Sequence, residues 1–143
     1  MRTRLVPLAV LAAGLLPTAA LAAAPAQKTV SARLVASAVT PKSGSTGSGK
    51  IVIKLSAQTG KACWTLSVKG LDRTLSAHVH SGAPTRTGKV VLPLGDVYAA
   101  QGCVSAPKSV LNAVARSPKS YYVDVHTRKY VNGAIRGQLR SGG

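Results

Sequence analysis

The sequence predicts an all-β domain, an antiparallel β-sandwich or small barrel of about seven or eight short strands with one short helix. Three observations predict this fold. Apolar and polar residues alternate along most of the chain, turns containing Gly or Pro separate the alternating runs, and the period changes to that of a helix only once.

Alternation marks the strands of the first half. Apolar side chains occupy every second position in the runs 30–39, 51–55, 62–68 and 75–80, and Gly70 ends the third run. The segment 41–49 is rich in Gly and Ser, which is typical of an exposed loop. A fifth run, 90–94, contains Pro93, and proline favours a strand at the edge of a sheet.

The helix and the last strands follow. Val110, Leu111 and Val114 are spaced to form one face of a short helix, with Ser105 as its expected cap, Pro107 in its first turn and Pro118 after its end. Alternation then returns in 121–126 and 135–140, which predicts the final strands.

Residues 1–26 are predicted to be an export signal. Arg2 and Arg4 precede an apolar run, Leu5 to Leu16, and small residues then offer cleavage sites after Ala22 or Ala26. An uncleaved anchor would need about 20 apolar residues, and this run reaches that length only by including Pro17. We therefore expect a secreted or extracytoplasmic protein in which residues 27–143 form a single domain without a membrane span.

Cys63 and Cys103 both lie in the predicted mature domain. An even number of cysteines in an exported chain favours a disulfide, and a redox-active pair would more often show the spacing C-x-x-C. We expect one structural disulfide between them.

The charge balance restricts the functions that are open to the chain. It has 19 Lys and Arg against 3 acidic residues, for a net charge of +16, which becomes 16 − 2 = +14 without Arg2 and Arg4. The acidic residues are Asp72, Asp96 and Asp124, too few for paired catalytic carboxylates or an oxygen-ligand calcium cage. The charge favours an anionic cell-envelope polymer or an extracellular protein as partner. With five aromatic residues and no recognition motif, sequence-specific nucleic-acid binding is not expected.

Two enzyme motifs are incomplete or missing. Residues 44–50, GSTGSGK, match the start of a phosphate-binding loop, but Ile51 follows where Ser or Thr is needed, and a strand follows in place of a helix. The nucleophile motif G-x-S-x-G does not occur. We expect a protein that is not an enzyme.

Four residues have the spacing of a metal site. His78 and His80 lie on one face of a strand, roughly 7 Å apart at Cα, and Asp124 and His126 have the same spacing on a later strand. Three imidazoles and one carboxylate suit copper or zinc. The alternative is that these histidines bond neighbouring backbone groups and fix two hairpins. A weak repeat supports paired hairpins, because Gly88 follows His80 and Gly133 follows His126 at similar spacings, each before a strand.

The segments AHVHSGAPTRTGKVVLPL, from Ala77, and YYVDVHTRKYVNGAIRGQL, from Tyr121, resemble the two signature blocks of the CHRD domain, the module named after chordin. The resemblance implies an extracellular β-sandwich of immunoglobulin-like character. Such domains occur in an animal antagonist of secreted growth factors and in small exported bacterial proteins, and we do not expect growth-factor binding in a chain of this kind. The motif residues are His78, His80, Gly82, Gly88, Tyr122, Val123, His126, Thr127, Gly133, Ile135, Arg136, Gly137, Gln138 and Leu139.

Two positions depart from the family pattern. Asp124 stands where the family often has Asn, and Ala134 stands where many members have an acid. A role that needs a carboxylate at position 134 is therefore not open to this chain, and Arg136 lacks that neighbour.

Overall fold

The computed structural model describes residues 26–142, so residues 1–25 of the predicted export signal, with the Ala22 cleavage site, lie outside the described part of the chain. The elements follow in the order β1 (Lys28–Val35), η1 (Ala36–Ala38), β2 (Ser48–Ser56), β3 (Lys61–Lys69), β4 (Thr74–Ser81), β5 (Val90–Pro93), β6 (Gln101–Ser105), α1 (Lys108–Arg116), η2 (Pro118–Ser120), β7 (Tyr121–Thr127), β8 (Ile135–Gln138) and β9 (Arg140–Ser141).

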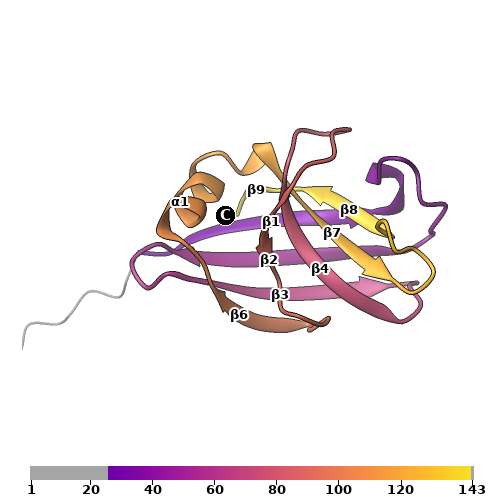
Figure 1. Cartoon of the computed structure of the whole chain (residues 1–143), viewed down its shortest axis with the longest axis horizontal. Coiled ribbons are helices and arrows are strands. Elements are labelled where there is room, and N and C mark those ends of the chain that lie inside the picture. Colours follow the sequence, from indigo (N-terminus) through magenta and orange to yellow (C-terminus); the bar gives the residue numbers. More distant parts are fainter. Residues whose placement is uncertain (1–25, 143) are drawn as a thin grey trace, which may run out of the picture.

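The strands form one antiparallel sheet in the order β5-β4-β7-β8-β1-β2-β3-β6, with β9 also paired to β1. The sheet curls until its two edges approach each other (Figure 1). The segment that joins β5 to β6 bridges these edges, since Tyr98 N–H donates to the Leu75 carbonyl of β4 and Leu66 N–H of β3 donates to the Ala100 carbonyl. The all-β prediction is confirmed, and so is the edge position of the strand that contains Pro93; two separate sandwich layers stay a prediction.

The core fills the inside of this curled sheet. Alternate residues of each strand point inward, and in β2 the inward positions Ile51, Ile53 and Leu55 are almost completely buried. Trp64 is the largest core side chain, and its indole N–H donates to the Ala99 carbonyl at 3.1 Å. The same alternation sends the polar residues of each strand to the outer surface.

The predicted helix is present as α1, which buries Leu111 and Val114 against β1 and β2. The prediction that Ser105 caps this helix is wrong. Ser105 is the last residue of β6, and its hydroxyl accepts a hydrogen bond from Lys61 Nζ. Pro107 occupies the cap position instead, and it accepts no side-chain hydrogen bond from the first turn because it has no polar side chain. None of the helices in residues 26–142 has the length and apolar character needed to span a bilayer.

Cys63 and Cys103 form the predicted disulfide. They are directly opposite each other in the β3–β6 pair, with their Cα atoms 4.0 Å apart. Both lie on the outer face, since Ala62 and Trp64 point into the core. The bond therefore fastens the edge strand β6 to the rest of the sheet.

Candidate metal centre

Four side chains meet on the outer face of the neighbouring strands β4 and β7. Ala77 and Val79 of β4 point into the core, as do Val123 and Val125 of β7. Alternation therefore sends the residues between and after them outward, which brings together His78, His80, Asp124 and His126. The structure thus gathers every residue of the predicted metal site.

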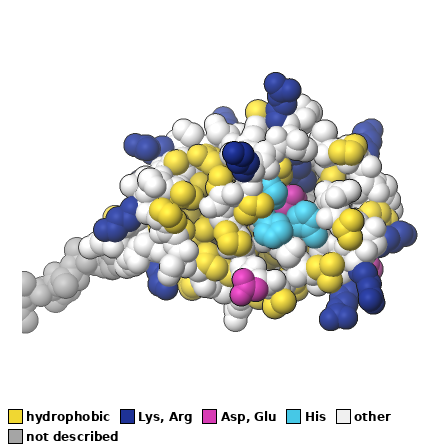
Figure 2. All heavy atoms as spheres, in the orientation of Figure 1, with side chains coloured by type: hydrophobic (Ala, Val, Ile, Leu, Met, Phe, Trp, Pro, Cys, Tyr) yellow, Lys and Arg dark blue, Asp and Glu magenta, His cyan; other side chains and the backbone are white. Residues whose placement is uncertain are grey.

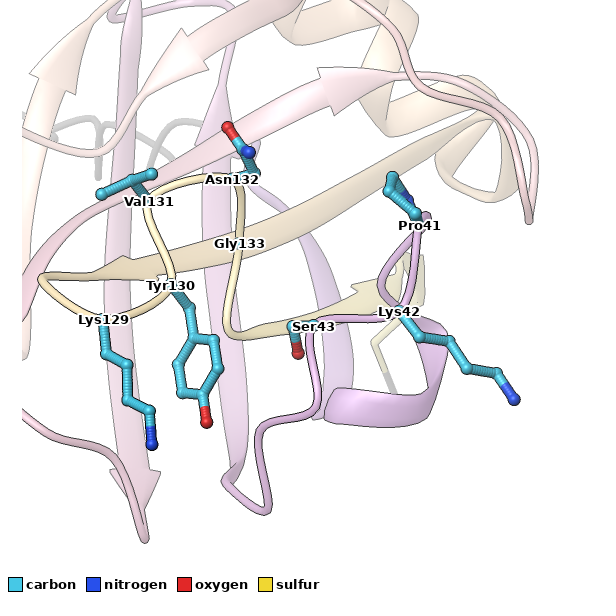
Figure 3. A pocket seen from close by; sticks show the side chains of 8 residues that line it. All are labelled: Pro41, Lys42, Ser43, Lys129, Tyr130, Val131, Asn132 and Gly133. Atoms are coloured by element: carbon cyan, nitrogen blue, oxygen red, sulfur yellow. The ribbon is translucent and has the colours of Figure 1, made fainter.

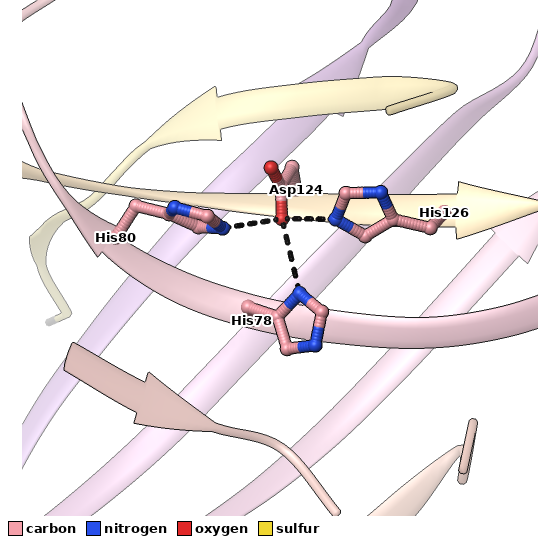
Figure 4. Close-up of side chains that lie close together, drawn as sticks. All are labelled: His78, His80, Asp124 and His126. Carbon is pink, nitrogen blue, oxygen red and sulfur yellow. Dashed lines mark hydrogen bonds and ion pairs between the residues drawn. The ribbon is translucent and has the colours of Figure 1, made fainter. Parts of the chain in front are cut away.

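The strand register explains this arrangement. His78 is directly opposite Asp124, and each strand has a histidine two residues farther along, His80 on β4 and His126 on β7. Because the strands are antiparallel, the two later histidines lie on opposite sides of the central pair. Figure 4 shows the Asp124 carboxylate between the rings of His80 and His126, with His78 facing it from the opposite strand. The two hairpins of the weak repeat, β4–β5 and β7–β8, therefore lie side by side in the sheet and are related by a local twofold axis.

One carboxylate oxygen is close to three imidazole nitrogens. Asp124 Oδ1 lies 3.0 Å from Nε2 of His126, 3.1 Å from Nε2 of His80 and 3.9 Å from Nδ1 of His78. The four donor atoms all lie within 4.8 Å of one another. Around a tetrahedral zinc with bonds of about 2.0–2.1 Å, neighbouring donor atoms are about 3.3 Å apart. The cluster is therefore already close to the size of a coordination sphere.

Backbone carbonyls fix two of the rings. Nδ1 of His80 lies 2.9 Å from the Gly88 carbonyl oxygen, and Nδ1 of His126 lies 2.9 Å from the Val131 carbonyl oxygen. Because a carbonyl oxygen only accepts, each Nδ1 carries the hydrogen. In the neutral imidazole the Nε2 atom then has a free lone pair, and both Nε2 atoms face Asp124. This pattern, with one nitrogen on a carbonyl and the other free, is typical of histidines that bind metals.

Two of the facing nitrogens lack a hydrogen-bond partner. Nδ1 of His78 and Nε2 of His80 are shielded from solvent, and neither makes a hydrogen bond, although the latter is near Asp124. The Asp124 side chain is 10% exposed, and His78 is the most open histidine at 25%. The unprotonated His80 nitrogen would face the Asp124 oxygen with lone pair against lone pair, and the His78 nitrogen has no partner, so both arrangements are costly. A cation among the four side chains would satisfy both nitrogens.

The electrostatics of the cluster favour positive charge beside Asp124. Burial opposes ionisation of Asp124, yet His126 and His80 outweigh it and lower the pKa of the carboxyl to about 2. The Asp124 hydrogen bond raises the pKa of His126. Burial opposes the charged form of His80, but Asp124 and the Gly88 carbonyl raise its pKa. For His78, burial and the nearby His126 lower the pKa. In the metal-free protein, the carboxylate therefore favours protons on His80 and His126.

Three further motif residues, Tyr122, Arg136 and Gln138, support the loop between β4 and β5, which carries the Gly88 carbonyl beside His80. The Tyr122 ring stacks on His80 with ring centres 4.9 Å apart, and the Arg136 guanidinium lies 3.4 Å from the centre of the other Tyr122 face. Arg136 Nη2 also donates to the carbonyls of Ala83 and Arg86, and Gln138 Nε2 donates to the Gly82 carbonyl. The motif identified these residues, but no sequence signal gave their role, which is to position the loop that carries the Gly88 carbonyl.

We expect Gly88→Ala to weaken metal binding more than its effect on stability explains. A Cβ at this position would overlap the Ser81 carbonyl oxygen, so the loop must shift and carry the Gly88 carbonyl away from His80. Loss of such an orienting contact costs about 10–100-fold in metal affinity. The control is Gly44→Ala, which also strains the backbone because Gly44 has a φ of 72°, but whose added Cβ meets no atom within 4 Å. Equal affinities of the two variants for zinc, measured by calorimetry, would contradict this prediction.

The other motif residues serve the fold. Val123, Ile135 and Leu139 are completely buried in the core, and the Thr127 hydroxyl accepts a hydrogen bond from Tyr130 N–H. Gly137 lies directly against the Arg33 carbonyl, where a side chain would not fit. Gly133 has a φ of 114° in the turn after Val131. The family signature therefore combines the cluster with the packing that supports it.

A shallow hollow lies on the far side of the same turn. It has a volume of about 240 Å³ and is lined by residues 41–43 and 129–133. Figure 3 shows Tyr130 and Lys129 extending past the backbone on the side of Ser43. The hollow has no imidazole or carboxylate in its lining, so it is separate from the histidine cluster.

The comparisons with known proteins agree with the resemblance seen in the sequence. The family model of the CHRD domain matches residues 30–139, which includes all strands from β2 to β8 and the four clustered residues. No curated protein and no solved structure matches the chain. The chain therefore belongs to the CHRD domain family.

Proposed function

We propose that this chain is an exported CHRD-domain protein that binds one copper or zinc ion through His78, His80, His126 and Asp124. The observation that carries the proposal is the direction of the imidazole lone pairs. Nδ1 of His80 and Nδ1 of His126 donate to the carbonyls of Gly88 and Val131, so the two Nε2 atoms converge on one carboxylate oxygen and would offer their lone pairs to a metal once deprotonated.

The alternative function of these histidines, fixing the two hairpins, explains only half of their contacts. Nδ1 of His80 and Nδ1 of His126 do bond backbone carbonyls. That role does not need a carboxylate on the other side of each ring, and it leaves Nδ1 of His78 buried without a partner. A metal ion accounts for both, because it accepts lone pairs from three nitrogens and an oxygen at once.

The donor set also indicates the kind of metal site. Four protein ligands complete a tetrahedral sphere, which is typical of structural or storage sites, whereas catalytic zinc sites keep a position open for water. We therefore infer a binding protein and not an enzyme. Copper(II) is expected to bind more tightly than zinc, since nitrogen and oxygen sites generally follow this order.

Calorimetric titration of the purified, metal-stripped protein with zinc and copper(II) tests the proposal. We expect one ion per chain, and at least about 100-fold weaker binding for Asp124→Asn, because a charged ligand is lost. Asp96→Asn is the matched control, since Asp96 is an exposed acid outside the cluster. Uptake well below one ion per chain, or equal affinities for the two variants, would refute the metal site.

A further inference from the structure

The outer surface of β1, β2 and β3 is strongly basic. Alternation sends the side chains of Arg33, Lys50, Lys54, Lys61 and Lys69 outward, and all five are exposed. Arg140 of β9 joins them, since it is paired with Ser31 on the outer side of β1. We call these six residues the basic face. No acidic residue occurs in β1, β2, β3 or β9.

The strand pairing brings these charges together. Arg33 is directly opposite Lys50, and Lys69 is one diagonal step away because its partner is Ser48. Lys54 and Lys61 are diagonal neighbours farther along, since Ser56 is the partner of Lys61. The two groups are about 13 Å apart, the length of four strand residues.

Small polar residues separate the cations and leave the surface hollowed. A depression of about 270 Å³ is lined by Arg33, Ser48, Gly49, Lys50, Ser67 and Lys69. A second one, of about 200 Å³, is lined by Val52, Lys54, Cys63, Trp64 and Thr65. Both lie over β2 and β3, so they follow one another along the strands. Hydroxyl groups of Ser and Thr are thus available between positive charges.

The basic face is distinct from the metal centre. In the curled sheet, β4 and β7 form one wall and β2 and β3 form another, and Figure 1 shows the first pair in front of the second. On the front wall the histidines form one group, with most Lys and Arg side chains toward the rim (Figure 2). The basic face and the metal centre therefore lie on different parts of the curled sheet.

We infer that the basic face binds an acidic polysaccharide. Its cations would pair with the anionic groups of the polymer, and its hydroxyls would bond the sugar hydroxyls between them. The face offers no aromatic ring on which a base could stack, because Trp64 is 5% exposed and points into the core. The exposed large apolar residues, Leu75, Val90, Val97 and Val131, lie on other segments, so nothing here anchors a lipid bilayer or a protein hot spot.

The test compares two triple variants of equal net charge. K50Q/K54Q/K69Q removes half of the basic face, and K89Q/K108Q/K119Q removes three exposed lysines elsewhere. Binding is measured at about 0.15 M salt, where distant charges are screened. The probes are alginate, dextran sulfate and dextran phosphate, which separate carboxylate, sulfate and phosphate as the recognised group, with neutral dextran and oligo-dT for comparison.

We expect at least one acidic polymer to bind, with affinity lowered about tenfold in the first variant and changed little in the second. Asp124→Asn is expected to bind the polymer like the unmodified protein, which keeps this result independent of the metal site. An equal loss of affinity in both triple variants would show that binding depends only on the net charge, and it would overturn the inference. Absence of binding at this salt concentration, or tighter binding of oligo-dT than of every polysaccharide, would also overturn it.

Discussion

Replacing both cysteines, in Cys63→Ala with Cys103→Ala, is expected to lower the free energy of unfolding by about 4 kcal/mol. The disulfide closes a loop over a sequence separation of 40, and its removal returns the conformational entropy of that loop to the unfolded chain. The small domain has a core without Phe, and small domains have a net stability of about 5–15 kcal/mol. The edge strand β6 is also paired to β3 by only five residues, so it is the element most affected.

Urea unfolding followed by tryptophan fluorescence measures this loss, because Trp64 is directly opposite Gly102 of β6. Adding a thiol reductant to the unmodified protein should reproduce the effect, whereas the double variant should not respond to it. A loss below about 1 kcal/mol would show that the disulfide does not carry the stability assigned to it.

The second large effect is the dependence of stability on pH in the metal-free protein. The lowered pKa of Asp124, about 2 against 3.8, corresponds to about 2 kcal/mol that is present above pH 4 and is lost as the pH falls toward 2. The raised pKa values of His80 and His126 give stability that is present below about pH 6.5 and is lost as the pH rises through their values in the folded protein. Stability should therefore be greatest between about pH 4 and 6.5.

The remaining charged neighbours modify this profile without reversing it. The pKa of His78 is lowered, so this residue opposes folding below about pH 6.5 and offsets part of the gain from the other two histidines. Arg136 faces Asp124 from β8 and stays charged throughout this range.

Unfolding measured at pH 3, 5.5 and 8 in the presence of a chelator tests this profile. Asp124→Asn should lose about 2 kcal/mol at pH 5.5 and respond much less to pH, while Asp96→Asn should follow the unmodified protein. Saturating zinc should remove the decline in the free energy of unfolding above pH 6.5, because the metal takes the place of the protons on His80 and His126. The same pH profile in both variants would contradict the charge distribution assigned to the cluster.

The sequence predicted the parts of the fold that depend on local pattern. Alternation marked the strands, the change of period marked α1, and two cysteines after a predicted export signal indicated the disulfide. The H-x-H and D-x-H spacings likewise placed His78 and His80, and Asp124 and His126, on common faces. These features depend on residues a few positions apart, whose relation is fixed by the geometry of a single strand.

What the sequence left open depends on register and on loops. No local signal set His78 opposite Asp124, and a shift of one residue would have sent the two strands' polar side chains to opposite faces. The carbonyls of Gly88 and Val131 that orient the rings belong to turns, where any residue supplies the same backbone acceptor. The basic face could not be predicted for the same reason, since its lysines and arginines are scattered in the sequence and are brought together only by strand pairing.

The most direct test of the metal centre is to locate the bound ion. Crystals of the zinc- or copper-loaded protein, with anomalous diffraction recorded at the absorption edge of the metal, give its position. We expect one ion bonded at about 2.0–2.2 Å to nitrogens of His78, His80 and His126 and to an oxygen of Asp124. An ion bound elsewhere on the chain, with Asp124 still in direct contact with His126, would contradict it.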